Sequence, residues 1–254
     1  IAVVGKYTDH IDSYKSIQES LIHGGIANDV KADIHWLSSE VFDNGEGVEK
    51  LKEYDGLLIP GGFGPRGVEG MLETIRWARE NQMPFFGICL GLQCAVIEFA
   101  RNVCGLEGSH SSEFAEASPD PVICLLDSQL QVTTMGGTMR LGAYPCALGE
   151  GTKAREIYGV DEISERHRHR FEVNNEYRDL LTDNGMTISG TSPDGGLVEM
   201  IELTEHPWFV AGQFHPELKS RPTRPHPLFA SFVGAAAAYA RNQPAKPAAE
   251  PASV

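Results

Sequence analysis

The sequence of 254 residues has few of the features that mark disulfide-linked, membrane-spanning or nucleic-acid-binding proteins. Its five cysteines are an odd number with no Cys-x-x-Cys pair, which argues against a disulfide framework or a zinc cluster and favours the reducing cytoplasm. Its apolar runs are shorter than the roughly 20 residues that cross a bilayer, and no signal peptide is visible. The net charge of −14 argues against a nucleic-acid partner, because proteins that bind nucleic acid are usually basic.

The chain also lacks an initiator methionine, so we expect it to be a piece of a longer protein. Its composition, 41% hydrophobic and 22% charged, is typical of a globular chain. Residues 243–254 are mostly Pro, Ala and Glu, which predicts a disordered tail. The expected organisation is therefore one domain over residues 1–242 followed by that tail.

The first hundred residues alternate between short apolar runs and helical patterns. Strands are predicted at residues 1–5, 30–37, 56–60 and 85–88, with helices between them. This alternation is typical of βαβ units, which build a parallel sheet with right-handed crossovers.

The later strands have fewer helices between them. They are predicted at residues 122–126, 142–148, 187–190, 197–203 and 208–214. Residues 197–203 are interpreted as alternating in polarity, which predicts a strand with one solvent-exposed face. The glycine-rich residues 135–142 are predicted to be a mobile loop. The expected fold class is α/β: an open, mostly parallel, twisted, flavodoxin-like sheet with helices on both faces and added antiparallel strands.

Residues 84–93, Pro-Phe-Phe-Gly-Ile-Cys-Leu-Gly-Leu-Gln, have the pattern of a nucleophile elbow. A predicted strand ends close to Cys89 and a helical pattern follows it. Gly87 and Gly91 leave room for a tight turn and tolerate unusual backbone angles. The turn would expose the Cys89 sulfur at a helix N-terminus, where partial positive charge favours the thiolate. The alternative is that Cys89 is a buried core cysteine.

Two other segments contain candidate catalytic residues. Residues 61–64, Gly-Gly-Phe-Gly, follow a predicted strand; they are either a phosphate loop, although the Gly-Lys-Ser/Thr ending is missing, or the source of oxyanion-binding N–H groups. In Gln-Phe-His-Pro-Glu, residues 213–217, extended backbone before the proline would place His215 and Glu217 on one side. Together with Cys89 they would supply a nucleophile, a base and the carboxylate that orients it.

The separations of these three motifs resemble those of class I glutamine amidotransferases. Three further stretches, at residues 137–143, 163–174 and 215–229, are similar to the C-terminal domain of the CTP synthase family. The resemblance covers residues 1 to about 241.

The resemblance implies a role for each matching residue. Cys89 would attack the amide carbon of glutamine, His215 would move the proton, and Glu217 would orient His215. The N–H groups of Gly62 and Leu90 would form an oxyanion hole. The complete set implied to bind L-glutamine is Gly62, Leu90, Gln93, Glu113 and Arg170. A carboxylate and a guanidinium suit the two charged ends of an amino acid.

The resemblance also implies partners. Ammonia would pass to an N-terminal amidoligase domain, absent from this chain, that uses ATP and Mg²⁺ to convert UTP to CTP in a homo-oligomeric, tetrameric enzyme. No cofactor is expected in this domain, although GTP is a possible effector. The alternatives are another class I amidotransferase, a γ-glutamyl hydrolase, or a catalytically silent domain for assembly or effector sensing.

The sequence alone does not decide the roles of two basic segments. His167 and His169 alternate with arginines, so in a strand they would share one face; with no third ligand apparent, no metal site is expected. Lys219, Arg221 and Arg224 form a basic, proline-rich segment. It is either a solvated loop or a surface directed at the partner domain or an effector nucleotide.

Overall fold

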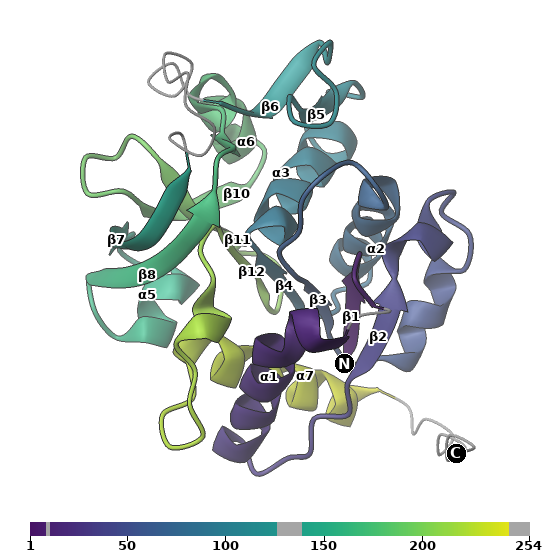
Figure 1. Cartoon of the computed structure of the whole chain (residues 1–254), viewed down its shortest axis with the longest axis vertical. Helices are drawn as coiled ribbons and strands as arrows, with labels where there is room; N and C mark the ends of the chain where they lie inside the picture. The colour runs from purple at the N-terminus through teal and green to yellow at the C-terminus, as the bar shows by residue number, and fades with distance from the viewer. Residues whose placement is uncertain (9–10, 126–138, 244–254) are drawn as a thin grey trace.

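The computed structural model describes residues 1–8, 11–125 and 139–243 (Figure 1). Within these ranges, nine strands form one sheet in the order β2-β1-β3-β4-β12-β11-β10-β7-β8. The neighbours from β2 to β12 are parallel, and each later neighbour is antiparallel. The predicted fold class, a parallel sheet with added antiparallel strands, is therefore confirmed.

The parallel strands are short and almost wholly buried, except for the edge strand β2. They are β2 (His35–Ser38), β1 (Ala2–Gly5), β3 (Leu57–Ile59), β4 (Phe85–Ile88) and β12 (Phe209–Gly212). The antiparallel strands are β11 (Val198–Leu203), β10 (Met186–Thr191), β7 (Arg140–Leu148) and β8 (Glu162–His169). A small second sheet contains β5 (Ser109–Ser111), β6 (Asp120–Cys124) and β9 (Glu172–Val173).

Helices cover both faces of the main sheet (Figure 1). The long helices are α1 (Lys15–Ala27), α2 (Val68–Glu80), α3 (Leu90–Asn102) and α7 (Pro227–Asn242). Short helices are α5 (Lys153–Tyr158) and α6 (Arg178–Asp183), with 3₁₀ turns at η1 (Ile11–Tyr14), η2 (Ser39–Phe42), η3 (Val48–Glu53), η4 (Asn175–Tyr177) and η5 (Pro216–Leu218).

Alternating strand residues supply two separate hydrophobic cores. In β3, Leu57 and Ile59 pack with α2 and α3, whereas Leu58 packs with α1 and α7 on the other face. Side chains of a strand point to opposite faces in turn, so continuous apolar runs are what a parallel sheet covered on both faces requires.

Two strand predictions need correction. The strand predicted at residues 30–37 begins only at His35, where pairing with Ala2 of β1 starts. The exposed face predicted for residues 197–203 is wrong, because every residue of β11 is buried. Glu199 and Glu202 are three positions apart and so lie on opposite faces of this central strand.

Both glutamates of β11 have partners that explain their burial. Glu199 pairs with Arg140, and the Glu202 carboxylate accepts hydrogen bonds from the N–H groups of Lys153 and Ala154, at 2.8 and 3.0 Å. The second contact caps the N-terminus of α5, where a negative charge is favourable.

Other expectations fall partly outside the described residues. Residues 135–138 of the predicted mobile loop and residues 244–254 of the predicted tail are not described, whereas Arg140–Gly142 belong to β7. Among the helices that the structure describes, none combines the length and apolarity needed to span a bilayer.

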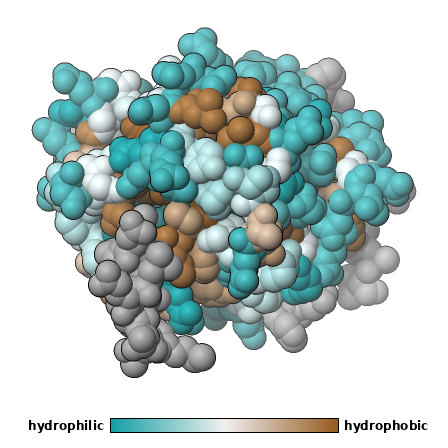
Figure 2. Space-filling model, turned by 90° about the horizontal axis from the view of Figure 1, so that it is seen from above, coloured by the Kyte–Doolittle hydropathy of each residue, from teal (hydrophilic) through white to brown (hydrophobic). Residues whose placement is uncertain are grey.

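The surface is largely hydrophilic, with separate apolar patches on the face shown in Figure 2. Two of the large exposed apolar side chains, Phe63 and Leu218, line one cavity beside Cys89. They therefore belong to the rim of the candidate site described below.

The turn from β4 to α3 leaves no room for a side chain at Gly91, because a Cβ there would overlap the carbonyl oxygen of Ile59. We expect Gly91→Ala to lower the free energy of unfolding by about 1–3 kcal/mol, as overpacking typically does. Urea denaturation measures this loss. Gly196→Ala is the matched control, because a Cβ there would make only an ordinary van der Waals contact, 3.4 Å from the Asp194 side chain; equal losses in the two variants would contradict the expectation.

Candidate active site

Cys89 lies at the junction of β4 and α3, in a backbone conformation that is rare for a residue with a side chain. Its φ is 53° and its ψ is −99°. Its N–H donates to the carbonyl of Gly212 at 2.8 Å, which ties the turn to the end of β12. Such strain costs of order 1–3 kcal/mol and persists where surrounding contacts impose it. This is the strained strand-to-helix turn of a nucleophile elbow.

The two glycines around Cys89 are needed for space. A Cβ at Gly87 would lie 2.8 Å from the Ala211 Cβ and from the backbone of Gly91. Neither Gly87 nor Gly91 has a positive φ. The predicted tightness is therefore confirmed, whereas the prediction that these glycines adopt unusual backbone angles is wrong; Cys89 itself adopts the unusual angle.

His215 and Glu217 are in contact just after β12. The His215 Nδ1 and the Glu217 Oε1 are 2.7 Å apart, and both side chains are largely buried. The backbone is not extended as predicted, because Pro216 begins the 3₁₀ turn η5. This turn brings the Glu217 carboxylate into contact with the His215 imidazole. The two side chains are therefore neighbours, as predicted, but through a 3₁₀ turn and not through extended backbone.

The other side of His215 faces Cys89. A Cβ at Gly61 would lie 2.8 Å from the His215 Cε1 and 3.7 Å from the Cys89 Cβ, so both side chains meet at this glycine. Although burial by itself lowers the pKa of His215, its interactions with Cys89 and Glu217 raise that pKa to about 10. The His215 Nε2 is buried without a hydrogen bond to any residue that the structure describes. Contacts with Glu217 and Cys89 favour the protonated imidazole and so account for the raised pKa of His215.

The predicted oxyanion groups lie next to this pair. Leu90 is the first residue of α3, so its N–H has no acceptor within the helix. Gly62 is adjacent, because a Cβ on it would be 3.1 Å from the Leu90 Cδ2. The structure therefore brings together both glycine-rich segments that the sequence singled out.

Cys89 also borders a cavity of about 440 Å³ that contains the other predicted substrate-binding side chains, Gln93, Glu113 and Arg170. Glu113 accepts a hydrogen bond from the Gly64 N–H at 3.2 Å. Burial raises the pKa of Glu113, while the Gly64 N–H and the charges of Lys6 and Arg170 lower it. A carboxylate and a guanidinium in one cavity offer opposite charges to an amino acid.

A second cavity, of about 300 Å³, is also lined by Cys89 and includes His215 and Glu217 in its wall. Gly62, Phe63, Cys89 and Arg168 line both cavities. Cys89 therefore borders both cavities although it is only 3% exposed.

Lys6 is a site residue that sequence reasoning missed. It follows β1, and its Nζ donates to the carbonyl oxygens of Phe63 and Gly64. Burial lowers the pKa of Lys6. The available signal was its position after a buried strand, since residues at the carboxyl ends of parallel strands meet at one edge of the sheet.

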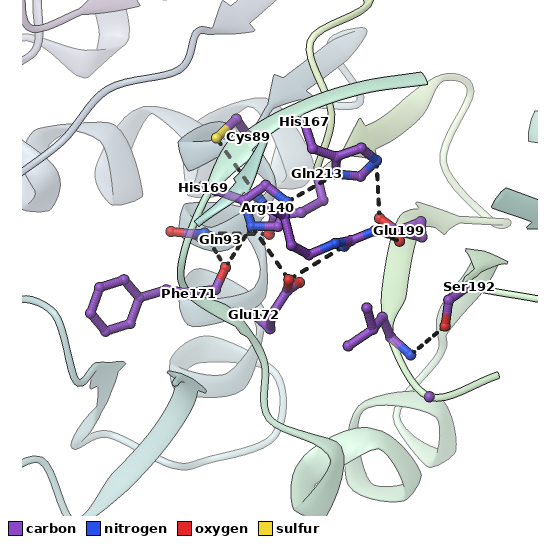
Figure 3. A network of polar contacts seen from close by, with 12 residues as sticks. Cys89, Gln93, Arg140, His167, His169, Phe171, Glu172, Ser192, Glu199 and Gln213 are labelled. Atoms are coloured by element: carbon purple, nitrogen blue, oxygen red, sulfur yellow. Dashed lines mark hydrogen bonds and ion pairs between the residues drawn. The ribbon is translucent and has the colours of Figure 1, made fainter. Parts of the chain in front are cut away.

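A buried ionic network extends away from the cavity, as Figure 3 shows. Arg140 pairs with Glu199 at 2.7 Å and with Glu172 at 3.3 Å. Burial raises the pKa of Glu199, and raises that of Glu172 to about 8 against the opposing charge of Arg140. Three strands, β7, β9 and β11, thus meet through one guanidinium.

His167 and His169 do share the buried face of β8, as predicted, and their rings are hydrogen-bonded at 2.9 Å. Burial, with the charge of Arg140, lowers the pKa of His167 to about 2 and that of His169 to about 3, so both rings are neutral. Across the described ranges, no group of three or more His, Cys, Asp and Glu side chains is arranged to hold a metal ion.

The basic segment after Glu217 is partly anchored. Lys219 contacts the carboxylate of Glu165 at 3.1 Å, whereas Arg221 and Arg224 are exposed and form a tight turn through their backbones. The sequence left two readings open, and the exposed arginines are compatible with either.

Arg140 offers a test of the buried network. We expect Arg140→Met to destabilise the fold by about 3–5 kcal/mol, because it removes the cation and the hydrogen-bond donors that the buried Glu172 and Glu199 share. Arg76→Met is the control, since Arg76 and Glu80 are about half exposed and such pairs contribute at most about 1 kcal/mol.

The loss should depend on pH. The pKa of Glu172 is about 8 in the folded protein and about 4.3 in an unfolded chain, so the folded state binds more protons and stability falls as pH rises between these values. Without Arg140 the pKa rises further, so urea denaturation should show a larger loss at pH 8.5 than at pH 5.5. A loss that is independent of pH would argue against this assignment.

Comparison with known proteins places the chain in a family. The family described as "Glutamine amidotransferase class-I" matches residues 9–235. A CTP synthase of Clostridium perfringens is 60% identical over 236 residues, which are 93% of this chain and 44% of the relative. A CTP synthase of Ruminiclostridium cellulolyticum is 59% identical over 239 residues, 94% of this chain and 45% of the relative. The chain thus spans less than half the length of these relatives.

A solved structure agrees with the sequence comparison. The glutaminase domain of Trypanosoma brucei CTPS, described with bound acivicin, has a TM-score of 0.88 and 38% identity, and 93% of each chain is covered. The chain therefore belongs to the class-I glutamine amidotransferase family and, within it, to the glutaminase domains of CTP synthases.

Proposed function

We propose that this domain hydrolyses L-glutamine to glutamate and ammonia through a thioester at Cys89. One observation supports the roles of these residues: the strained turn at Cys89 lies next to the His215–Glu217 pair, whose Nδ1 and Oε1 atoms are 2.7 Å apart. Both border cavities beside Cys89, and the larger cavity contains side chains of opposite charge. Membership of the family gives the reaction, and this geometry supports the roles of the residues.

In the first step the Cys89 thiolate attacks the side-chain amide carbon of glutamine. A bond forms between sulfur and carbon, and the carbonyl oxygen becomes negatively charged. The N–H groups of Gly62 and Leu90 donate hydrogen bonds to that oxygen. Donors that are already oriented toward developing charge lower the barrier because they need not reorganise.

In the second step the carbon–nitrogen bond breaks. The imidazolium of His215 gives its proton to the departing nitrogen, which leaves as ammonia, and the thioester remains on Cys89. Water then attacks the thioester while His215 removes its proton, and glutamate leaves as the thiolate re-forms. Glu217 keeps the imidazole in the required orientation throughout.

In this proposal the charged residues of the larger cavity recognise the amino-acid end of glutamine. Glu113 binds the α-ammonium, and Arg170 binds the α-carboxylate. Gln93 lines the same cavity. Opposite charges at the two ends favour a zwitterion over a simple amide.

The relatives suggest the wider context. We propose that residues 1–242 form the glutaminase domain, with 243–254 as a tail, and that an amidoligase domain outside this chain uses the ammonia, ATP and Mg²⁺ to convert UTP to CTP. A homo-oligomeric enzyme, such as a tetramer, and GTP as an effector belong to the same proposal. The five free cysteines favour the cytoplasm.

Loss of the nucleophile should abolish the reaction. We expect Cys89→Ala to release no glutamate from glutamine while its thermal unfolding stays cooperative, because the other four cysteines are outside the elbow. In the full-length protein the same variant should still use free ammonia. Glutamine hydrolysis by the Ala variant would exclude Cys89 as the nucleophile.

Loss of either charged partner should weaken recognition. Glu113→Ala or Arg170→Ala leaves one end of the zwitterion unpaired, which costs roughly 1.5–3 kcal/mol or about ten- to a hundredfold in kcat/KM. Steady-state kinetics with glutamine measure the loss. A variant with unchanged kinetics would remove that residue from the binding site.

The domain alone should be a poor glutaminase, because ammonia released without an acceptor is wasted. The Gly62 peptide lies in a glycine-rich loop, and loss of one oxyanion donor typically costs about 10²–10³ in kcat. We expect slower glutamate release from this chain than from the full-length enzyme during synthesis. Equal rates would show that the site is permanently assembled.

A further inference from the structure

Gln213 is a buried side chain that the roles above leave unused. It follows the last residue of β12, has no exposed surface, and its N–H donates to the Glu199 carbonyl at 2.8 Å. Its side-chain Nε2 donates to the Cys89 sulfur at 3.7 Å (Figure 3). Burying an amide is unfavourable unless its hydrogen bonds are made, so its partners need an explanation.

The surrounding contacts fix which end of the Gln213 amide faces the sulfur. The Phe171 carbonyl can only accept, so the group of Gln93 that lies 3.1 Å from it is the NH₂ group. The same NH₂ group donates to the Gln213 Oε1 at 3.3 Å. A flipped Gln213 amide would set two NH₂ groups against each other, so its Nε2 is the end that points toward Cys89.

The Phe171 carbonyl is itself held by a histidine. His169 Nδ1 lies 3.1 Å from it and must donate, which leaves the His169 Nε2 to accept from the His167 Nδ1–H. The carbonyl thus receives two donors, one for each lone pair. The orientation of the Gln213 amide is therefore determined by a fixed set of donors reaching back to β8.

We propose that Gln213 is a positioning residue for the nucleophile: its amide donates a hydrogen bond to the Cys89 thiolate and, through Gln93 and the Phe171 carbonyl, holds the sulfur in place. This inference rests on the proposed role of Cys89. The amide approaches as a neutral donor, so it supports the thiolate in every protonation state of His215. It also connects the sulfur with the wall of the substrate cavity, because Gln93 and Phe171 both line that cavity.

A different role would be structural: the amide fills space and satisfies Gln93. That role predicts a change in stability only. A positioning role also changes the protonation and reactivity of the sulfur, which can be measured without glutamine.

The test uses Gln213→Met, which keeps the approximate volume but removes the donor, and Gln213→Glu, which keeps the shape. Ser189→Ala is the matched control, since Ser189 is fully buried on β10 and its hydroxyl has no hydrogen-bond partner among the described residues. Each protein is treated with iodoacetamide from pH 5 to pH 10, and alkylation of the Cys89 peptide is followed by mass spectrometry. Glutamine hydrolysis is measured in parallel.

We expect Gln213→Met to lower kcat about 10- to 100-fold, the usual effect of a lost hydrogen bond to a charged group, with little change in KM. The alkylation profile of Cys89 should move to higher pH. In Gln213→Glu the activity relative to the wild type should rise as pH falls, because a protonated carboxyl can donate again. Ser189→Ala should behave as the wild type in both assays.

The proposal is overturned if Gln213→Met leaves the alkylation profile and kcat within twofold of the wild type, whatever its melting temperature. If Gln213→Met does not fold, Gln213→Glu provides the test. The proposal is then overturned if the glutaminase activity of Gln213→Glu, relative to that of the wild type, does not change with pH. A full-length wild-type protein without glutaminase activity would instead refute the proposed function, while the alkylation comparison would still test Gln213.

Discussion

The unusual backbone of Cys89 is the constraint on which the site depends. A positive φ at a residue with a side chain is unfavourable, so the surrounding chain must hold it. Gly87 and Gly91 allow β12 and β3 to approach within contact distance, and the Gly212 carbonyl fixes the Cys89 N–H. The same turn starts α3, so one local feature supplies both an accessible sulfur and the free N–H of Leu90.

The rest of the fold positions the residues that surround this turn. The segments after β1, β3 and β12 contribute Lys6, Gly62 and His215. The antiparallel half of the sheet supplies the far wall of the cavity through Arg170 and Phe171. Beneath that wall, Arg140 joins three strands through two buried carboxylates. Burying these charges is costly even when they are paired, and removing one partner is costlier still.

Sequence reasoning succeeded where the signal was local. The glycines around Cys89 and the His-Pro-Glu run are contiguous, and their spacing alone predicts a tight turn and a paired histidine. It failed for residues 197–203, which were predicted to have one solvent-exposed face, whereas every residue of β11 is buried and Glu199 and Glu202 lie on opposite sides of the strand. The position of Lys6 after a buried strand was a usable signal, whereas the roles of Arg140 and Gln213 were not predictable, because both depend on contacts with residues far away in the sequence.

The central claim is that Cys89 and His215 form a thiolate–imidazolium pair in the resting site. The direct measurement is an NMR titration of the His215 ring in the wild type and in Cys89→Ser. The account predicts a pKa of about 10 for His215 in the wild type and a lower pKa in the serine variant, where the neighbouring negative charge is lost. A wild-type pKa at or below the ordinary histidine value of about 6.5 would contradict it.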